Sequence, residues 1–163
     1  MKEFIIYTNG YHNHDTGMGA SSIVVFDKDE QELLYAASVA MPHGPGFFSN
    51  YHHWRACFGA LKSVSAMSKV TIKTPSQNCY MVLSGAWASE GKADQEEIDK
   101  CFYQKDAKLL EVTAVKVPGC ESAKRKDEPL EGSKRAFELS LQAVNLYVQT
   151  GKGVIVIGDI NRL

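Results

Sequence analysis

The chain has 163 residues, 44% of them hydrophobic, which is the size of one domain with a core of its own. Its 18 lysine and arginine residues nearly balance 19 aspartate and glutamate residues. This balance excludes a strongly basic protein whose overall charge would attract nucleic acid or a membrane surface. The apolar runs are far shorter than the ~20 residues of a membrane-spanning helix. We therefore expect one soluble domain over residues 1–163, without a membrane partner.

The cysteines indicate the compartment. They show no CxxC pair and no close metal-ligand spacing, and the charged opening MKEF does not resemble a secretory signal. The four positions are Cys57, Cys79, Cys101 and Cys120. We expect free thiols and a reducing, cytoplasmic location.

Strands dominate the first part of the chain. Residues 3–8 are rich in β-branched and aromatic side chains, and residues 20–41 contain two more such runs around an acidic turn. A loop rich in glycine and proline follows. Residues 51–67 then repeat apolar side chains at three- and four-residue steps behind a Ser49 or Asn50 cap. The pattern predicts three antiparallel strands and then an amphipathic helix.

Strands and helices alternate in the rest of the chain. Strands are predicted at 69–74, 109–117 and 153–160, and helices at 94–104 and 131–149. Asp94 would cap the first of these helices, with Glu97 completing a capping box. The second carries an apolar stripe of Phe137, Leu141, Val144 and Val148. This order implies helices packed on a mixed sheet, because strand–helix–strand units favour parallel pairing.

A polar segment between the first two strands carries the most specific signal. Residues 7–25 read YTNGYHNHDTGMGASSIVV, and the glycines Gly17 and Gly19 lead directly into the second strand. This segment resembles the opening of ribonuclease H, whose first strand ends in Thr-Asp-Gly. SNYHHW at 49–54, TPSQ at 74–77, and VKVPG followed by KRAFELS resemble later motifs of that family in the same order.

The resemblance implies an α/β fold. The expected architecture is a ribonuclease H-like mixed five-stranded sheet, with three antiparallel strands and then parallel additions. Helices flank this sheet, and an extra strand is expected at the C-terminal end.

The catalytic positions of the family are the exception to this similarity. The family cleaves phosphodiesters with carboxylates that hold two Mg²⁺ ions ~3.5–4 Å apart. Carried over one by one, the four carboxylate positions fall at Asn9, Trp54, Pro75 and Phe137, and the loop histidine falls at Pro118. A shift of one residue at the last position would reach Glu138. No catalytic residue and no cofactor is therefore expected, and Mg²⁺ or another divalent metal would be needed only by an active enzyme.

These observations favour a catalytically inactive ribonuclease H-like module that binds nucleic acid, either an RNA–DNA hybrid or a duplex. The groove beside Asn9 would then retain partners for phosphates, and affinity would fall steeply with salt. The candidate residues are Asn9, Tyr11, Asn50, Lys73, Ser76, Gln77, Lys116, Lys124, Arg125 and Lys134. Residues 85–97 oppose this hypothesis, because they are acidic where some ribonucleases H carry a basic, tryptophan-rich protrusion.

Two alternatives stay open. A protein-binding adaptor or inhibitor on the same fold would use an apolar patch around Phe47, Phe48, Tyr51 and Trp54. A metal-dependent nuclease with a rebuilt site would use His12, His14, Asp15 and His52, since imidazole binds transition metals. Degenerate copies of an enzyme occur in viruses and mobile elements, but the residues identify neither the source nor the oligomeric state.

Overall fold

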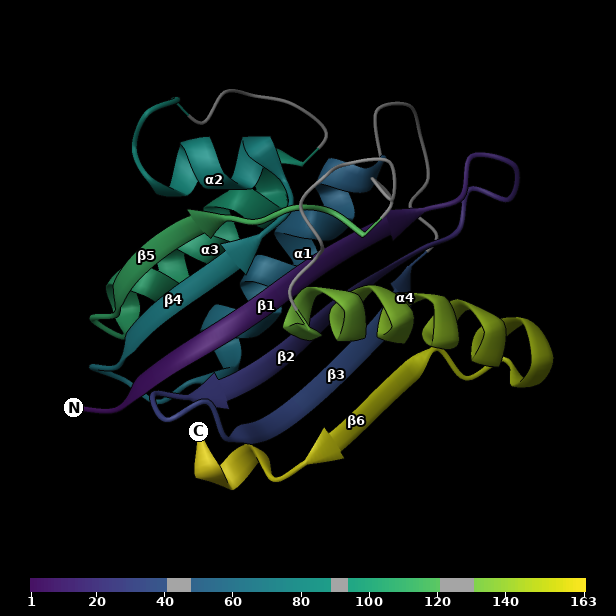
Figure 1. The fold of residues 1–163 in the computed structure, drawn as a ribbon. Coiled ribbons are helices and arrows are strands. Elements are labelled where there is room, and N and C mark those ends of the chain that lie inside the picture. Colours follow the sequence, from purple (N-terminus) through teal and green to yellow (C-terminus); the bar gives the residue numbers. More distant parts are fainter. Residues whose placement is uncertain (41–47, 89–93, 121–130) are drawn as a thin grey trace.

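A computed structural model describes residues 1–40, 48–88, 94–120 and 131–163. Its centre is one mixed six-stranded sheet with the strand order β5-β4-β1-β2-β3-β6 (Figure 1). The strands are β1 (Glu3–His12), β2 (Gly19–Asp27), β3 (Glu32–Ala40), β4 (Lys69–Thr74), β5 (Glu111–Lys116) and β6 (Val154–Gly158). The first three strands and β6 pair antiparallel, whereas β4 pairs parallel with β1 and β5 parallel with β4. The predicted mixed sheet with parallel additions and a further C-terminal strand is confirmed.

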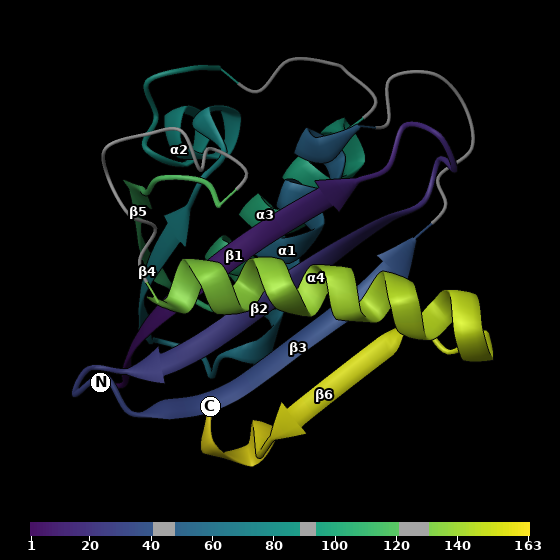
Figure 2. The ribbon, with the colours of Figure 1, turned by 45° about the vertical axis from the view of Figure 1, so that its right-hand side comes forward.

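Helices lie on both faces of this sheet. α1 (Ser49–Ser63) and α3 (Gln95–Ala107) cover one face, and α4 (Glu131–Thr150) crosses the other over β1, β2 and β3 (Figure 2). The short α2 (Gln77–Leu83) follows β4, and a 3₁₀ turn at Ile160–Arg162 follows β6. Among the described residues, no helix is both long enough and apolar enough to cross a membrane.

A separate hydrophobic core lies on each face of the sheet. Phe4 and Ile6 of β1 point toward α1 and pack in the larger core, which includes Trp54 and Leu61. Residues on the opposite face of the sheet, among them Tyr7, pack in a smaller core beneath α4. This alternation follows from the two-residue period of a strand, and both faces are buried because helices cover both.

The ends of several elements differ from the prediction. β1 continues to His12, so Asn9 lies inside a paired strand and not at its end. The residue before α1 is Phe48, and neither Ser49 nor Asn50 is the cap. Asp94 does precede α3, but its side chain makes no capping hydrogen bond.

The buried face of one helix was predicted incorrectly, and one short helix was missed. The fully buried face of α4 consists mainly of small side chains, including Ala136, Ser140 and Ala143, whereas Val148 of the predicted stripe is 70% exposed. A helix this close to a sheet has room mainly for small side chains at the contact. Leu139 is the one large side chain of α4 that is buried there, among the residues that the structure describes. The helix α2 was not predicted, although the Ser76 hydroxyl caps it by accepting from the Cys79 backbone N–H at 3.2 Å.

Candidate functional site

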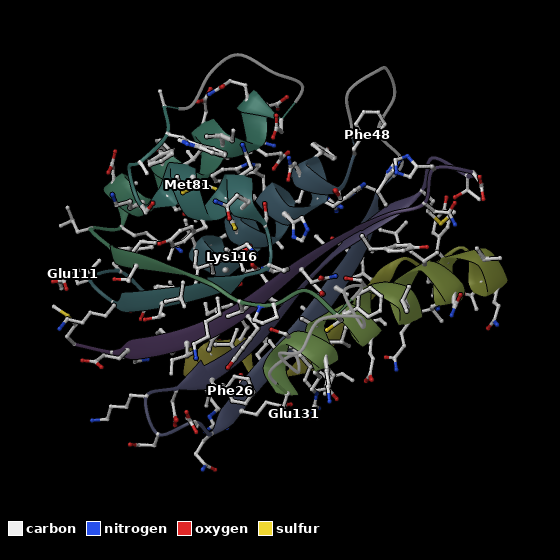
Figure 3. All side chains as sticks on the ribbon, turned by 45° about the horizontal axis from the view of Figure 1, so that its top comes forward. Phe26, Phe48, Met81, Glu111, Lys116 and Glu131 are labelled. Carbon is white, nitrogen blue, oxygen red and sulfur yellow. The ribbon has the colours of Figure 1, made fainter. Side chains whose placement is uncertain are left out.

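The topology brings several polar side chains to one edge of the sheet. Because β1, β4 and β5 are parallel neighbours, their C-terminal ends meet there. Tyr7 is paired with Lys73, and Thr74 with Lys116. Figure 3 labels Lys116 at the end of β5 and Glu131 at the beginning of α4. We call the group Thr8, Asn9, His53, Lys73 and Lys116 the strand-end site. Asn9 and Lys73 lie on the face of the sheet that carries α4, whereas His53 belongs to α1 on the other face and is influenced by Lys116.

Asn9 connects β1 to α4. Its side chain is only 7% exposed, and its amide nitrogen donates to the Ser140 hydroxyl oxygen at 3.1 Å. The Ser140 and Ser22 hydroxyl oxygens lie 2.9 Å apart, and Ser22 also donates to the Ala136 carbonyl. A buried polar group needs such partners, so this network holds α4 on the sheet. Asn9 therefore has a structural role, whatever else it contacts.

Lys73 places a positive charge beside β1. Its ammonium group donates to the Tyr7 hydroxyl at 3.3 Å and lies 5.2 Å from the centre of the Tyr7 ring. No carboxylate of the described residues forms an ion pair with it. The Tyr7 ring in turn lies against Gly132 at the beginning of α4, where any Cβ would overlap the ring. The sequence predicted Lys73, but not the tyrosine that orients it.

His53 borders the site from the side of α1. The backbone at His53 lies so close to Gly10 that a Cβ on this glycine would overlap it. The Nδ1 atom of His53 and the hydroxyl of Thr8 are buried, and neither has a hydrogen-bond partner among the described residues. Burial, and to a lesser extent the charge of Lys116, lowers the pKa of His53 to about 4. His53 is therefore neutral at pH 7 and offers a nitrogen rather than a charge.

The family's other carboxylate positions lie outside this group. Trp54 is fully buried, and its indole N–H donates to the Asn78 carbonyl oxygen at 2.8 Å. Pro75 is half-buried between β4 and α2. Phe137 is half-buried and Glu138 exposed, whereas Ser140 is the α4 residue that reaches Asn9. Trp54 therefore belongs to the core, whereas Phe137 is only half-buried.

The remaining predicted nucleic-acid contacts surround the same edge. Asn50 at the beginning of α1 accepts from the Ser76 hydroxyl at 3.3 Å, which joins the beginnings of α1 and α2. Gln77 is exposed next to Ser76, and Lys134 is exposed on α4. Tyr11 is half-buried near the end of β1. Lys124 and Arg125 lie outside the described residues.

The three histidines of the metal alternative come together, with His12 edge-on to His14 and stacked on His52. The ring centre of His12 lies 4.7 Å from that of His14 and 5.8 Å from that of His52. His52 is fully buried, and its Nε2 atom faces Gly19 and has no hydrogen-bond partner in the part of the chain that the structure describes. Asp15 is exposed in the loop. In the parts of the chain that the structure describes, no three His, Cys, Asp or Glu side chains are placed to hold a metal ion.

The predicted apolar patch does not form as a surface. Trp54 is buried in the core, Tyr51 is half-buried, and Phe48 is 52% exposed and lies 5.6 Å from both His12 and His14, centre to centre. Phe47 falls outside the described residues. The prediction of a patch containing Trp54 is therefore wrong, because the helix turns this ring inward.

Comparison with known proteins supports the fold. No protein-family model and no curated protein matches the sequence. Among solved structures, LC11-RNase H1 in complex with an RNA/DNA hybrid is similar, with a TM-score of 0.71 and 18% identity over 89% of this chain and 99% of that one. The N-terminal RNase H domain of a Mycobacterium tuberculosis protein gives a TM-score of 0.70 with 15% identity, over 93% of this chain and 99% of the other. RNase H1 of Halobacterium salinarum gives 0.61 with 16% identity, over 88% and 98%. The chain therefore has the ribonuclease H-like fold.

Proposed function

We propose that this chain is a ribonuclease H-like module that binds an RNA–DNA hybrid or a duplex without cleaving it. The observation that carries the proposal is the composition of the strand-end site. Its members are an amide, a hydroxyl, a neutral imidazole and two ammonium groups, with no carboxylate. The ammonium groups of Lys73 and Lys116 are donors to phosphate oxygens, whereas Thr8 and Asn9 are buried and the Asn9 amide nitrogen donates to Ser140. Ammonium–phosphate contacts supply most of the affinity for a nucleic-acid backbone.

The same side chains do not fit a pair of Mg²⁺ ions. Mg²⁺ requires oxygen ligands, usually including carboxylates. Here the positive charges of Lys73 and Lys116 would repel the ions, and the Asn9 amide nitrogen is committed to Ser140. We therefore derive no metal-dependent step for this site. The similar fold of LC11-RNase H1, whose structure contains an RNA/DNA hybrid, supports the choice of ligand.

The test is a cleavage and binding assay in which one labelled hybrid serves both purposes. The hybrid is incubated with the protein in Mg²⁺ or Mn²⁺ and analysed for fragments, and its binding is measured by fluorescence anisotropy over a range of salt concentrations. We expect intact hybrid and binding that weakens steeply as salt rises. Metal-dependent cleavage would refute the claim of inactivity, and absence of binding at low salt would refute the claim of nucleic-acid binding.

Lysine variants connect the binding to the site. Lys73→Gln and Lys116→Gln should each weaken binding and lower the salt slope by about one unit, because each removes a phosphate contact. Lys28→Gln is the matched control, since Lys28 is exposed in the turn after β2, at the opposite end of β1. Equal losses in the control and the site variants would indicate nonspecific attraction and contradict the assignment.

One observation favours the alternative of a protein-binding adaptor. The edge strand β6 and the turn after it expose Val154, Val156, Ile157 and Ile160 by 49% to 65%. An apolar edge strand can pair with an extended strand of a partner protein. Such binding would depend weakly on salt and would be unaffected by Lys73→Gln. Retention of the hybrid with a steep salt slope would therefore argue against it.

A further inference from the structure

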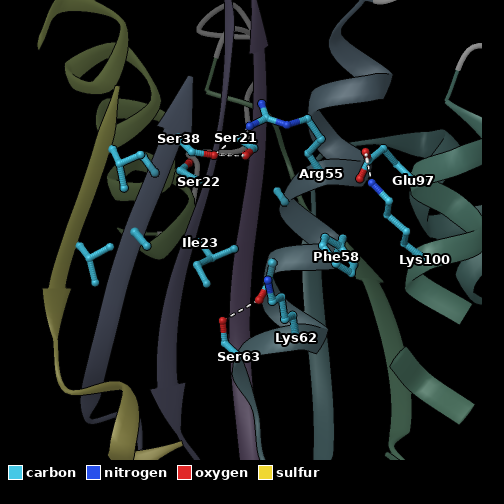
Figure 4. Close-up of a pocket in the computed structure, with 16 residues that line it drawn as sticks. Ser21, Ser22, Ile23, Ser38, Arg55, Phe58, Lys62, Ser63, Glu97 and Lys100 are labelled. Carbon is cyan, nitrogen blue, oxygen red and sulfur yellow. Dashed lines mark hydrogen bonds and ion pairs between the residues drawn. The ribbon is translucent and has the colours of Figure 1, made fainter. Parts of the chain in front are cut away.

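A second concave surface lies on the face of the sheet that carries α1, away from the strand-end site. α1 packs mainly over β1 and β2, and its flank faces β3 and β6. These strands and the flank of α1 enclose a groove of about 380 Å³ (Figure 4). The lining residues used below are Ser21, Ser38, Arg55, Phe58, Val154 and Val156.

The groove is polar at one end and apolar along its wall. Arg55 reaches from α1 toward the serines of β2 and β3, and its Nη2 atom donates to the Ser38 hydroxyl at 2.8 Å (Figure 4). The Ser21 and Ser38 hydroxyl oxygens lie 3.4 Å apart. Val154 and Val156 of β6 form the apolar wall, and they are 65% and 59% exposed.

The charge of Arg55 is not neutralised. Its Nη1 atom lies 3.1 Å from Nδ1 of His52, and burial together with the Arg55 charge lowers the pKa of His52 to about 3. His52 is thus a neutral acceptor. Tyr51 and, to a lesser extent, Glu97 are the groups that favour the charged form of Arg55. The pKa of Tyr51 is raised by burial, so its hydroxyl is neutral at pH 7, and Glu97 pairs with Lys100 at 3.1 Å. Within the described residues, no carboxylate forms an ion pair with Arg55.

A half-buried guanidinium group without a counter-ion is costly, and an anion would remove that cost. Guanidinium groups carry several N–H donors in a planar fork that matches carboxylate and phosphate oxygens. The neighbouring serine hydroxyls supply further donors, whereas the valine wall and Phe58 would cover an apolar body. The groove therefore combines one anchor for an anion with a surface for a hydrophobic group.

We propose that this groove binds a small organic anion, in which a carboxylate or phosphate group contacts Arg55 and Ser38 and an apolar body lies against Val154 and Val156. This site is separate from the strand-end site and does not depend on the proposed binding of nucleic acid. Arg55 has no part in that proposal.

The experiment uses the whole chain labelled with ¹⁵N and follows amide shifts by NMR during titration with four probes. Phenyl phosphate and hexanoate carry the two anionic groups on apolar bodies, inorganic phosphate carries the charge alone, and hexanol the apolar body alone. We expect one or both organic anions to shift the signals of Ser21, Ser38 and Val156 with a saturable dependence. Inorganic phosphate and hexanol should bind at least about tenfold more weakly, because each loses one of the two contacts. The stronger of the organic anions identifies the charged group that the site prefers.

Variants locate the binding. Arg55→Gln should lower the affinity for the preferred probe by about tenfold or more, and Arg55→Lys should lower it by less. Ser38→Ala should lower the same affinity by about threefold. Lys73→Gln, at the strand-end site, should leave the probe's affinity unchanged, and Arg55→Gln should leave hybrid binding unchanged. The proposal is overturned if none of the probes shifts the groove signals of the wild-type protein at millimolar concentration. It is also overturned if a folded Arg55→Gln variant binds the probe as tightly as the wild type.

Discussion

Acidification should destabilise the protein through His52, and the size of the effect follows from its burial. The ring is fully buried, its Nδ1 atom accepts from Arg55, and its pKa is lowered from the ordinary value of 6.5 to about 3. The unfolded chain takes up this proton near pH 6.5, whereas the folded protein resists it until about pH 3. Between these values the unfolded state binds more protons, so stability falls as the pH falls.

The magnitude can be worked out from the two pKa values. A difference of one pKa unit between the folded and unfolded states corresponds to at most about 1.36 kcal/mol of stability. Protonation of His52 in the unfolded state should therefore lower the free energy of unfolding by roughly 2 kcal/mol between pH 7 and pH 5. His53, with a pKa lowered to about 4, should cost roughly the same over that interval. The two histidines together should remove roughly 4 kcal/mol, a large share of the stability of a domain of this size.

The assay is urea unfolding at pH 7, 6 and 5, followed by the fluorescence of buried Trp54. In His52→Gln, the loss of stability between pH 7 and pH 5 should be roughly 2 kcal/mol smaller than in the wild type. Lys62→Gln, an exposed change on the same helix, should retain the wild-type pH dependence. If His52→Gln and the wild type lose the same stability on acidification, the buried neutral histidine is not the cause and the reasoning fails.

Three further predictions concern packing and thiol chemistry. Gly10→Ala should lower the free energy of unfolding by about 3 kcal/mol or prevent folding, because the new Cβ would overlap the α1 backbone. Urea unfolding measures this loss, and a wild-type midpoint would contradict the close approach. Ser140→Ala should lower the free energy of unfolding by about 1–3 kcal/mol in the same assay, because it removes the hydrogen-bond acceptor of the Asn9 amide. Unchanged stability would show that Asn9 finds another partner. Burial raises the pKa of Cys101 and shields its thiol. An aromatic disulfide reagent should therefore modify the half-buried Cys120 first and react with Cys101 only when the protein unfolds. Rapid modification of Cys101 in the folded protein would refute its burial.

The sheet could be predicted because it depends on short-range patterns. Alternating and β-branched runs identified all six strands, and the two long periodic helices were located to within a few residues. The face of α4 could not be predicted in the same way. Apolar periodicity favoured Phe137 and Val148, whereas the packing distance to the sheet selected Ala136 and Ser140. A helix that lies close to a sheet buries small side chains, and hydrophobicity alone does not show that closeness.

The candidate site could be predicted only in part. Lys73 and Lys116 were expected as phosphate contacts in the groove beside Asn9, on the resemblance to ribonuclease H. Tyr7 was missed, since it was counted only as part of a strand, although a tyrosine opposite a lysine in parallel register can hold the ammonium group. Asn9 was expected to face a ligand, and the network with Ser140 was invisible because these residues are 131 positions apart.

The polar residues in the first turns of α1 are more buried than their sequence pattern suggests. His52, His53 and Arg55 would ordinarily be assigned to the solvent side of an amphipathic helix. In the structure Gly10 on β1 and Gly19 on β2 lack the side chains that would hold this helix away, so its backbone and the His52 ring lie directly on the sheet. His52 is fully buried there in its neutral form, and Arg55, one turn later, extends to Ser38 in the groove. The two glycines, and not the helical residues themselves, therefore decide that this polar segment is buried, and they link the strand-end site to the groove through a single helix.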